Sequence, residues 1–383
     1  MELRHMDLAE IERAAAVLRA GGLALLPSET VYGVYAAASG SGVGVAALRA
    51  LSREPEVKAR TYPWTWHAAS RERVEEALPL KSPLHRRVAR VFLPGPVRLH
   101  VERTDEQIRA TLDALRVAPG IIDGEFVEAP GRVISVRVPD HEATRDVLTR
   151  AGGAAIAESA ANFGLGDGQV MTEASVQRAM EIGIGAALVD QPARFGRAST
   201  AIRLLAGGGY RIMSVGAIDE REVRARVERR VVFVCSGNTC RSPVAEAIAR
   251  HLLSNRPHAP GEAPVPVRVS SAGTSASVGM AMTPESAEAL TEMDIDPGRH
   301  TSRQLQQEEL AGADLVFVMT KQHRRVVEMM MGQRGTPIQL LDPDGADIDD
   351  PIGGPLRQYR EMAKTVRRAI ERRLAEIEEG DRR

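Results

Sequence analysis

The sequence predicts an α/β protein built from two domains, and three observations lead to this prediction. The chain has 383 residues, more than one ordinary hydrophobic core accommodates. Its hydrophobic share of 43% and charged share of 26% are typical of a globular protein. Short apolar runs alternate with stretches of helical periodicity along much of the chain. The formal net charge of −1 provides no whole-molecule field for nucleic acid or an anionic membrane.

The first part of the chain, residues 1–218, is predicted to be a mixed α/β domain. Residues 8–20 have the apolar spacing of a helix, and Gly21-Gly22 ends it. Residues 23–27 (LALLP) form a short buried strand that proline stops. Similar signals predict further elements, namely strands over 97–103 and 132–139 and a glycine-terminated helix over 142–152.

Residues 219–230 (DEREVRARVERR) form a run of charges with few apolar anchors. Such a run is typical either of a linker or of a short exposed helix. We therefore expect the boundary between the two domains here.

The second domain, residues 231–383, shows a more regular alternation of strands and helices. The predicted strands are 231–235, 267–273, 314–320 and 336–342, and the predicted helices are 242–253, 283–293 and 354–380. Buried strands that alternate with helices indicate a parallel sheet covered on both faces, which is a small doubly wound fold.

The loop after the first strand of this domain reads CSGNTCRSP and holds both cysteines of the chain. Backbone N–H groups of such a loop can surround a tetrahedral anion, and the following helix directs its positive end to the same point. Gly237 permits the tight curvature, and Arg241 can bind two phosphate oxygens in a fork. The positive field favours the thiolate form of Cys235, which makes it a nucleophile. Ser242 can cap the helix or donate a hydrogen bond to this thiolate.

Hydrolysis of a phosphate ester through this cysteine also needs an acid that protonates the leaving group. The segment DIDDPIGGP (347–355) supplies Asp349 and Asp350 on a loop, and Pro351 fixes the backbone after them. A zinc site is the weaker alternative for the cysteines, because it needs about four ligands and no further His/Cys cluster accompanies them.

Residues 231–376 resemble the low-molecular-weight protein phosphatases. The matching motifs, in chain order, are CSGNTCRSP, SSAG (270–273), ADLVFVMTKQHRR (313–325) and DDPIGG. The resemblance implies Cys235 as nucleophile, Arg241 as phosphate clamp and Asp350 as general acid, acting on a phosphorylated protein without metal or cofactor. It implies supporting roles for the remaining loop residues, namely Ser236, Gly237, Asn238, Thr239, Cys240 and Ser242. Cys240 either traps oxidised Cys235 as a reversible disulfide or is a small packing residue.

Features of the same region bear on the substrate. Arsenate reductases of this fold use further cysteines downstream, and this chain has none after Cys240. Tyrosine-directed members usually have aromatic walls beside the loop, whereas here Ile352 follows the Asp-Pro pair and residues 270–284 contain no aromatic side chain. Thr239 is polar where those members tend to carry an aliphatic residue, and in this it resembles the bacterial protein-arginine phosphatases. We predict a preference for phosphoarginine, with phosphotyrosine as the alternative.

Residues 25–39 (LLPSETVYGVYAAAS) resemble the YrdC-like threonylcarbamoyl-AMP synthases. Five further segments follow in family order: FLPGPVRLHV (92–101), RVPDH (137–141), AESAANFGLG (157–166), ASTAIRL (198–204) and YRIMSVGAI (210–218). The resemblance implies a twisted mixed-sheet α/β domain that makes threonylcarbamoyl-AMP for tRNA modification from ATP (with Mg), threonine and bicarbonate. The nucleotide- and substrate-binding residues that it implies are Thr30, Tyr32, Lys58, Arg60, Arg137, Asn162 and Ser199.

This sequence departs from the synthase pattern in the segments that bind nucleotide and substrate. Lys58-Ala-Arg60 lacks the proline that follows in the family, and the Ser-Ala-Asn segment is Ala160-Ala161-Asn162. Arg98 and Arg203 stand where a threonine and an acid are expected, although an arginine on a strand is most often solvated. Two alternatives remain: an active synthase, or a retained fold that binds nucleotide or double-stranded RNA or regulates the phosphatase.

Trp64 and Trp66 lie in a segment that diverges from the family. They either stack on a base or, as alternating residues of a short strand, are half-buried packing residues. No apolar stretch approaches the ~20 residues that span a bilayer, and the N-terminal residues read as a helix rather than an export signal. We therefore expect a cytoplasmic protein that does not bind membranes.

Overall fold

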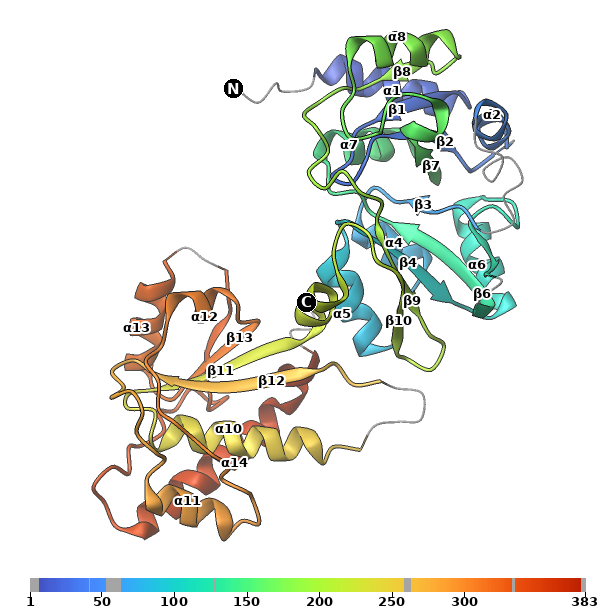
Figure 1. The fold of residues 1–383 in the computed structure, drawn as a ribbon. Coiled ribbons are helices and arrows are strands. Elements are labelled where there is room, and N and C mark those ends of the chain that lie inside the picture. The colour runs from blue at the N-terminus through green and yellow to red at the C-terminus, as the bar shows by residue number, and fades with distance from the viewer. Residues whose placement is uncertain are drawn as a thin grey trace. The chain divides into compact units, whose positions relative to one another are not determined.

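The computed structural model describes residues 7–40, 42–52, 63–126, 129–257, 263–332 and 335–379. The chain forms two compact units that divide in sequence near residue 225. Each unit has its own sheet, which Figure 1 shows.

Within the described residues, the first unit contains a ten-stranded mixed sheet in the order β10-β9-β4-β6-β3-β7-β2-β1-β8, with β5 paired to β6. The strands are β1 (Leu23–Leu26), β2 (Gly33–Ala37), β3 (Trp66–His67), β4 (Val97–Glu102), β5 (Asp123–Phe126), β6 (Ala129–Arg137), β7 (Ala155–Ser159), β8 (Ala186–Ala187), β9 (Thr200–Leu204) and β10 (Tyr210–Ser214). The helices are α1 (Leu8–Arg19), α2 (Val43–Leu51), α4 (Arg71–Ala77), α5 (Pro83–Phe92), α6 (Asp105–Leu115), α7 (Glu142–Ala151), the 3-10 turn η1 (Ala160–Phe163) and α8 (Glu173–Glu181).

The five elements predicted for this unit are all present, and their ends differ from the prediction by at most three residues. Helix α1 shows why the pattern succeeds. The side chain of Asp7 accepts the N–H of Ala9 at 3.1 Å and caps the helix. The helix then buries a single apolar face against β1, β2 and α7, formed by Ile11, Ala14, Ala15 and Leu18.

The charged run 219–230 contains a helix, α9 (Glu220–Val227). Of the two predicted forms this is the helical one, but the helix is not fully exposed. Val223 and Val227, one turn apart, are both completely buried. The next strand begins at Arg229, two residues before the predicted start.

The second unit contains a parallel sheet in the order β12-β11-β13-β14, as the alternation of elements predicted. Its strands are β11 (Arg229–Cys235), β12 (Val267–Gly273), β13 (Leu315–Val318) and β14 (Ile338–Leu340). Its helices are α10 (Arg241–Ser254), α11 (Pro284–Thr291), α12 (Gln307–Ala311), α13 (Lys321–Met331) and α14 (Leu356–Glu379).

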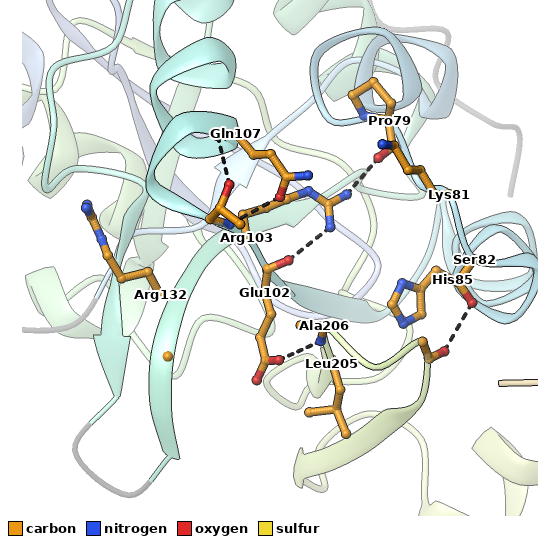
Figure 2. Close-up of a pocket in the computed structure, with 13 residues that line it drawn as sticks. Pro79, Lys81, Ser82, His85, Glu102, Arg103, Gln107, Arg132, Leu205 and Ala206 are labelled. Carbon is orange, nitrogen blue, oxygen red and sulfur yellow. Dashed lines mark hydrogen bonds between the residues drawn. The ribbon is translucent and has the colours of Figure 1, made fainter. Parts of the chain in front are cut away.

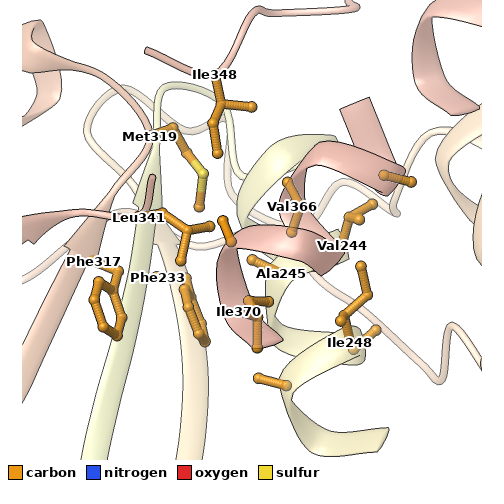
Figure 3. Packing of buried hydrophobic residues seen from close by; sticks show 14 of the residues in the cluster. Phe233, Val244, Ala245, Ile248, Phe317, Met319, Leu341, Ile348, Val366 and Ile370 are labelled. Carbon is orange, nitrogen blue, oxygen red and sulfur yellow. The ribbon is translucent and has the colours of Figure 1, made fainter. Parts of the chain in front are cut away.

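Alternate side chains of the central strands enter two separate cores. Phe233 and Phe317 stack on one face of the sheet, with ring centroids 5.7 Å apart, against α10, α11 and α14 (Figure 3). Val234 and Val318 belong to the core on the opposite face, which α12 and α13 cover. Both faces are therefore buried, which is why these strands are almost uniformly apolar.

The register places the ends of the strands together. Cys235 is paired with Gly273, and Val234 with Val318, so β11, β12 and β13 end at the same edge of the sheet. The loops that follow them leave from this edge, where doubly wound sheets bind their ligands.

Candidate functional site

The loop of residues 235–241 connects β11 to α10, and several of its carbonyl groups are bonded outward. Backbone N–H groups of the 274–283 segment donate to the carbonyl oxygens of Cys235, Ser236 and Thr239, at 2.9 to 3.0 Å. In a planar trans peptide group the N–H points opposite to the carbonyl. These bonds therefore turn loop N–H groups inward. The N–H of Asn238 lies 3.3 Å from Cys235 Sγ.

The thiol of Cys235 sits at the base of this loop and is almost buried, with 2% of the residue exposed. Ser242 Oγ lies 3.0 Å from Cys235 Sγ. Of the two roles predicted for Ser242, only this contact is found. The helix begins at Arg241 and its N-cap residue, Cys240, makes no capping side-chain bond. Ser242 is thus one residue inside the helix and faces the thiol.

Asn238 is completely buried and adopts a left-handed backbone, with φ of 55°. Its side-chain amide donates to the hydroxyls of Ser242 and Ser271, both at 3.0 Å. Its side-chain oxygen accepts the N–H of Arg303 at 3.0 Å, and its carbonyl oxygen lies 2.7 Å from His300 Nε2. The loop is therefore held in a curved shape from several directions.

Arg241 and Asp350 meet at the mouth of the loop. Arg241 Nη2 donates to Asp350 Oδ2 at 2.5 Å, and Nη1 donates to the carbonyl oxygen of Ile348 at 3.2 Å. The arginine side chain is 5% exposed and the aspartate side chain 39% exposed. A buried cation that faces the loop can bind an anion, and the more exposed carboxyl group beside it can transfer a proton to a leaving group.

Thr239 and Cys240 form the far side of the loop. Thr239 is half-buried, while 3% of Cys240 is exposed. Cys240 Sγ lies 3.6 Å from the hydroxyls of both Thr239 and Thr283, and both cysteines are free thiols. Cys235 and Cys240 therefore lie in the same loop and are not joined by a disulfide. Gly237 completes the loop, and a Cβ built on it would approach only Thr239 Oγ1, at 3.6 Å.

The segments that flank the loop carry exposed aliphatic side chains. Val278, Met280 and Ile352 have exposed fractions of 73%, 55% and 62%. Met280 is tied to Ser302 through its N–H, and the N–H of Ile352 donates to Asp350 Oδ1 at 3.3 Å. These exposed side chains are aliphatic, not aromatic.

His323 also contacts the loop, and the sequence assigned it no role. Its Nε2 lies 2.8 Å from Ser236 Oγ, and its Nδ1 lies 2.8 Å from Thr320 Oγ1. Burial lowers the pKa of His323 to about 4, helped by the charge of Arg241 and opposed by Asp350 and Asp347. His323 lies in the segment 313–325, which is one of the motifs that resemble the phosphatase family. That resemblance was the only sequence feature that could have pointed to a role for His323.

In the first unit, three of the predicted binding residues converge. Thr30, Arg137 and Ser199 line a cavity of about 120 Å³, together with Arg98 and His67. Arg137 Nη2 donates to Glu29 Oε1 at 2.8 Å and to Thr30 Oγ1 at 2.7 Å. Arg98 thus lines the candidate cavity instead of projecting into solvent. Burial and the charges of Arg137 and Arg98 lower the pKa of His67 to about 3.

Tyr32 and Asn162, which the structure describes, do not line that cavity. The hydroxyl of Tyr32 donates to the carbonyl oxygen of Asp190 at 2.9 Å, and Tyr32 is completely buried. The amide of Asn162 donates to Glu158 Oε1 at 3.0 Å, so it reaches the cavity wall through another residue. Lys58 and Arg60 lie outside the described residues.

Two further expectations for the first unit can be compared with the structure. Of the two alternatives for Trp64 and Trp66, the packing role is confirmed and base stacking is not, and the burial is deeper than predicted, with 1% and 0% exposed. Arg203 is 1% exposed instead of solvated, because its Nε donates to Glu102 Oε1 at 2.6 Å and its Nη2 donates to the carbonyl oxygen of Gly131 at 3.0 Å.

A second cavity of the first unit, of about 570 Å³, lies where β4 ends (Figure 2). None of the predicted site residues that the structure describes lines it. Its charged groups are largely held by the protein itself. Arg103 donates to the carbonyl oxygens of Pro79 and Glu102, and the Glu102 carboxylate accepts the N–H of Ala206 at 2.6 Å.

Among the described residues, no group of three or more His, Cys, Asp or Glu side chains is placed to hold a metal ion. Over the same part of the chain, no helix has the length and apolar character needed to cross a membrane.

Comparison with known protein families assigns both units. Residues 230–382 match the family model described as low molecular weight phosphotyrosine protein phosphatase. Residues 16–216 match the Sua5/YciO/YrdC model, which carries the description telomere recombination.

Individual relatives match the second unit. A protein-arginine-phosphatase of Bacillus subtilis (strain 168) is 33% identical over 40% of this chain and 99% of its own length. The low molecular weight protein-tyrosine-phosphatase PtpB of Staphylococcus haemolyticus (strain JCSC1435) is 35% identical over 34% of this chain and 88% of its own length. The solved YwlE arginine phosphatase from Geobacillus stearothermophilus is 32% identical, with a TM-score of 0.34, over 39% of this chain and 91% of that one.

Proposed function

We propose that this chain, which belongs to the low molecular weight phosphotyrosine protein phosphatase family through residues 230–382, hydrolyses phosphoarginine in proteins through a cysteinyl-phosphate. Through residues 16–216 the chain also belongs to the Sua5/YciO/YrdC family. The observation that carries this proposal is the meeting of Cys235, Arg241 and Asp350 around one loop. A nucleophile, a cation for the phosphoryl oxygens and a proton donor are the groups that the reaction requires.

The proposed reaction has two steps. Cys235 Sγ attacks phosphorus while the Arg241 guanidinium and the loop N–H groups bind the phosphoryl oxygens. The phosphorus–nitrogen bond breaks, and Asp350 gives its proton to the leaving guanidine. A water molecule then attacks the sulfur-bound phosphorus and passes a proton to the Asp350 carboxylate. The phosphorus–sulfur bond breaks, which returns the thiolate and releases inorganic phosphate.

Three features support phosphoarginine over phosphotyrosine. The hydroxyl of Thr239 lies on the loop, where it can hydrogen-bond a guanidinium. Asp350 can pair with the same group before it protonates the nitrogen. The exposed side chains of Val278 and Ile352 are aliphatic, so they offer an aromatic ring no stacking partner. Relatives at similar identity carry both names, so the identities alone do not favour either substrate.

The substrate preference is tested by the ratio of kcat/KM for phosphoarginine to kcat/KM for phosphotyrosine on the full chain. We expect a ratio above one. A higher kcat/KM for phosphotyrosine would refute the proposed preference for phosphoarginine. Cys235→Ser should abolish both activities with an unchanged circular dichroism spectrum. Persistent turnover by this variant would refute Cys235 as the nucleophile.

For the first unit we propose synthesis of threonylcarbamoyl-AMP from ATP, threonine and bicarbonate. Its support is the convergence of Thr30, Arg137 and Ser199, together with Arg98, on one cavity of a Sua5/YciO/YrdC-family fold. The test is pyrophosphate release from ATP that requires both threonine and bicarbonate. Absence of release from folded protein would eliminate this activity in favour of the alternative, a unit that binds nucleotide or RNA without catalysis.

A further inference from the structure

We propose that His323 is a positioning residue that fixes the first arm of the 235–241 loop relative to the loop that carries Asp350. The proposal rests on the phosphatase function proposed above and concerns how its two working loops are held at a constant separation.

Both nitrogens of the His323 ring are engaged, so the orientation of the ring is determined. Nε2 lies 2.8 Å from Ser236 Oγ and Nδ1 lies 2.8 Å from Thr320 Oγ1. Thr320 is also the N-cap of α13, since its hydroxyl accepts the N–H of His323 at 3.2 Å. The residue is 5% exposed, so water does not compete freely for these bonds.

Ser236 is the first residue after the thiol, and His323 holds its side chain while another segment holds its backbone. The carbonyl oxygen of Ser236 accepts the N–H of Ser275 at 3.0 Å, which directs the following N–H into the loop. With both contacts in place, this peptide group cannot rotate without breaking a buried hydrogen bond. Loss of the His323 contact leaves the first arm held from one side only.

The residue before the N-cap of α13 and the first residue of the helix also hold the loop of residues 347–351. Asp347 Oδ1 accepts the N–H of Lys321 at 2.8 Å, and the N–H of Ile348 donates to the carbonyl oxygen of Met319 at 2.9 Å. Met319, Lys321 and His323 thus form one short rigid segment that touches both loops. This segment is the link through which the Cys235 side and the Asp350 side keep their spacing.

Burial and the charge of Arg241 favour a neutral His323 ring, against the opposing charges of Asp350 and Asp347. Arg241 acts on it from the loop, Asp347 and Asp350 act from the 347–351 loop, and burial lowers its pKa to about 4. A neutral imidazole adds no second cation beside Arg241. It can therefore orient Ser236 by hydrogen bonding without changing the charge that receives the phosphate.

The test is a double-mutant cycle on the full chain, read through the dissociation constant of inorganic phosphate. We expect His323→Asn, whose shorter side chain does not reach Ser236, to weaken phosphate binding about tenfold. Ser236→Ala should weaken it by a similar factor, and the double variant should be no weaker than either single variant. His323→Gln, which keeps a terminal nitrogen at comparable reach, should restore much of the affinity.

Controls separate positioning from a general effect on folding. Gln322→Ala changes an exposed neighbour on the same helix and should leave phosphate binding unchanged. Arg241→Ala should abolish the binding and so identify it with this loop. Additive losses in the cycle, or a lower melting temperature with unchanged phosphate affinity, would overturn the proposal.

Phosphate binding is measured without turnover, so the experiment tests the role of His323 separately from the proposed phosphatase function. If the protein binds phosphate but hydrolyses neither phosphoarginine nor phosphotyrosine, the proposed function fails while the cycle still decides the role of His323. If hydrolysis proceeds and the cycle is additive, the proposed function stands and the role of His323 fails.

Discussion

At the scale of single residues, Asn238 joins several segments of the second unit at one buried point. It contacts the helix through Ser242, the edge strand through Ser271 and the following segment through Arg303. A non-glycine residue with positive φ is uncommon, and asparagine tolerates it better than most residues. The backbone shape and the side-chain contacts are therefore satisfied by one residue type.

We predict that Asn238→Ala lowers the free energy of unfolding by about 2–3 kcal/mol, because it strands buried polar partners and strains the backbone. Urea unfolding of the second unit, followed by circular dichroism, measures the change. Asp294→Ala is the matched control, since Asp294 also has positive φ, of 57°, but is exposed. Equal losses in the two variants would show that backbone strain alone is responsible.

Thr239 carries the second residue-scale prediction. Replacement by isoleucine removes the hydroxyl that can bond a guanidinium and adds apolar surface beside the loop. We expect Thr239→Ile to lower the phosphoarginine-to-phosphotyrosine ratio of kcat/KM by about tenfold. Thr301→Ile, at an exposed position, serves as the control. An unchanged ratio for Thr239→Ile would remove this residue from substrate selection.

The sequence could indicate the residues of the site that lie in a local motif, and it missed those that distant segments contribute. Cys235, Asn238 and Arg241 stand within seven residues of each other, and Asp350 lies in a recognisable Asp-Pro loop. Ser271 and His323 reach the site only because the sheet register brings their segments to the same edge. By themselves, a serine and a histidine carry no recognisable signal in the sequence, and only the fold brings them next to the loop.

At the scale of elements, Gly273 at the end of β12 lets two loops pass closely. A Cβ at this position would lie 2.4 Å from the carbonyl oxygen of Ser236 and 3.1 Å from Asn238 Cβ. The first obstacle is backbone, which cannot rotate aside as a side chain would. Glycine is therefore required by close approach at this point, and not by its backbone angle.

We predict that Gly273→Ala costs about 1–3 kcal/mol of stability and reduces phosphatase kcat/KM several-fold, because the loop must shift outward. Gly335→Ala is the control within the same unit, since a Cβ there meets nothing within 4 Å. Steady-state kinetics and urea unfolding provide the two measurements. Full activity of Gly273→Ala would show that the loop accommodates the methyl group without losing its shape.

Two buried histidines make the stability of both units depend on pH. The pKa of His67 is about 3 beside Arg137 and Arg98, and that of His323 is about 4 among Arg241, Asp350 and Asp347. Both lie below the ordinary value of about 6.5, so the unfolded chain takes up protons first as the pH falls. The stabilising contribution is complete above about pH 6.5 and is lost as the pH falls toward the folded values.

We therefore expect His323→Gln to flatten the decline in stability of the second unit between about pH 6.5 and 4. His67→Gln should do the same for the first unit. Melting temperatures measured across this range test both statements. A slope that neither substitution changes would assign the acid sensitivity to carboxylates instead.

The elements with the clearest signals were predictable, and the short ones were not. Helix α1 and strand β12 match their predicted ranges closely, because α1 has a cap and a helical apolar spacing, while β12 begins with an apolar/polar alternation and ends at a glycine. Strands β3 and β8 contain two residues each, which is too short for any periodicity. Strand β3 forms because β6 and β7 offer hydrogen bonds on both of its sides, and β8 forms by pairing with β1 at the end of the described sheet.

At the scale of the whole molecule, each unit has its own hydrophobic core. The chain has two tryptophans, and both are buried in the first unit. Tryptophan fluorescence therefore reports unfolding of the first unit alone. The second unit can be followed separately by its phosphatase activity.

We predict that the two activities are lost separately. Cys235→Ser should abolish phosphatase activity and leave both the fluorescence transition and pyrophosphate release unchanged. Arg137→Gln should abolish pyrophosphate release, because the cavity loses its Glu29-paired cation, while phosphatase kcat/KM stays within about twofold. A phosphatase defect in Arg137→Gln would reveal communication between the units.

A phosphate that binds at the loop must displace Asp350 from its ion pair with Arg241. A buried guanidinium without an anion is costly, and here the protein supplies one from its own chain. Arrival of substrate is thus an exchange of counter-ions: the phosphoryl group takes over the arginine, and the Asp350 carboxylate is released beside the leaving group, where it takes up a proton from solvent before it acts as the general acid. Departure of inorganic phosphate reverses the exchange, so the resting site regenerates its own neutralised state after each turnover.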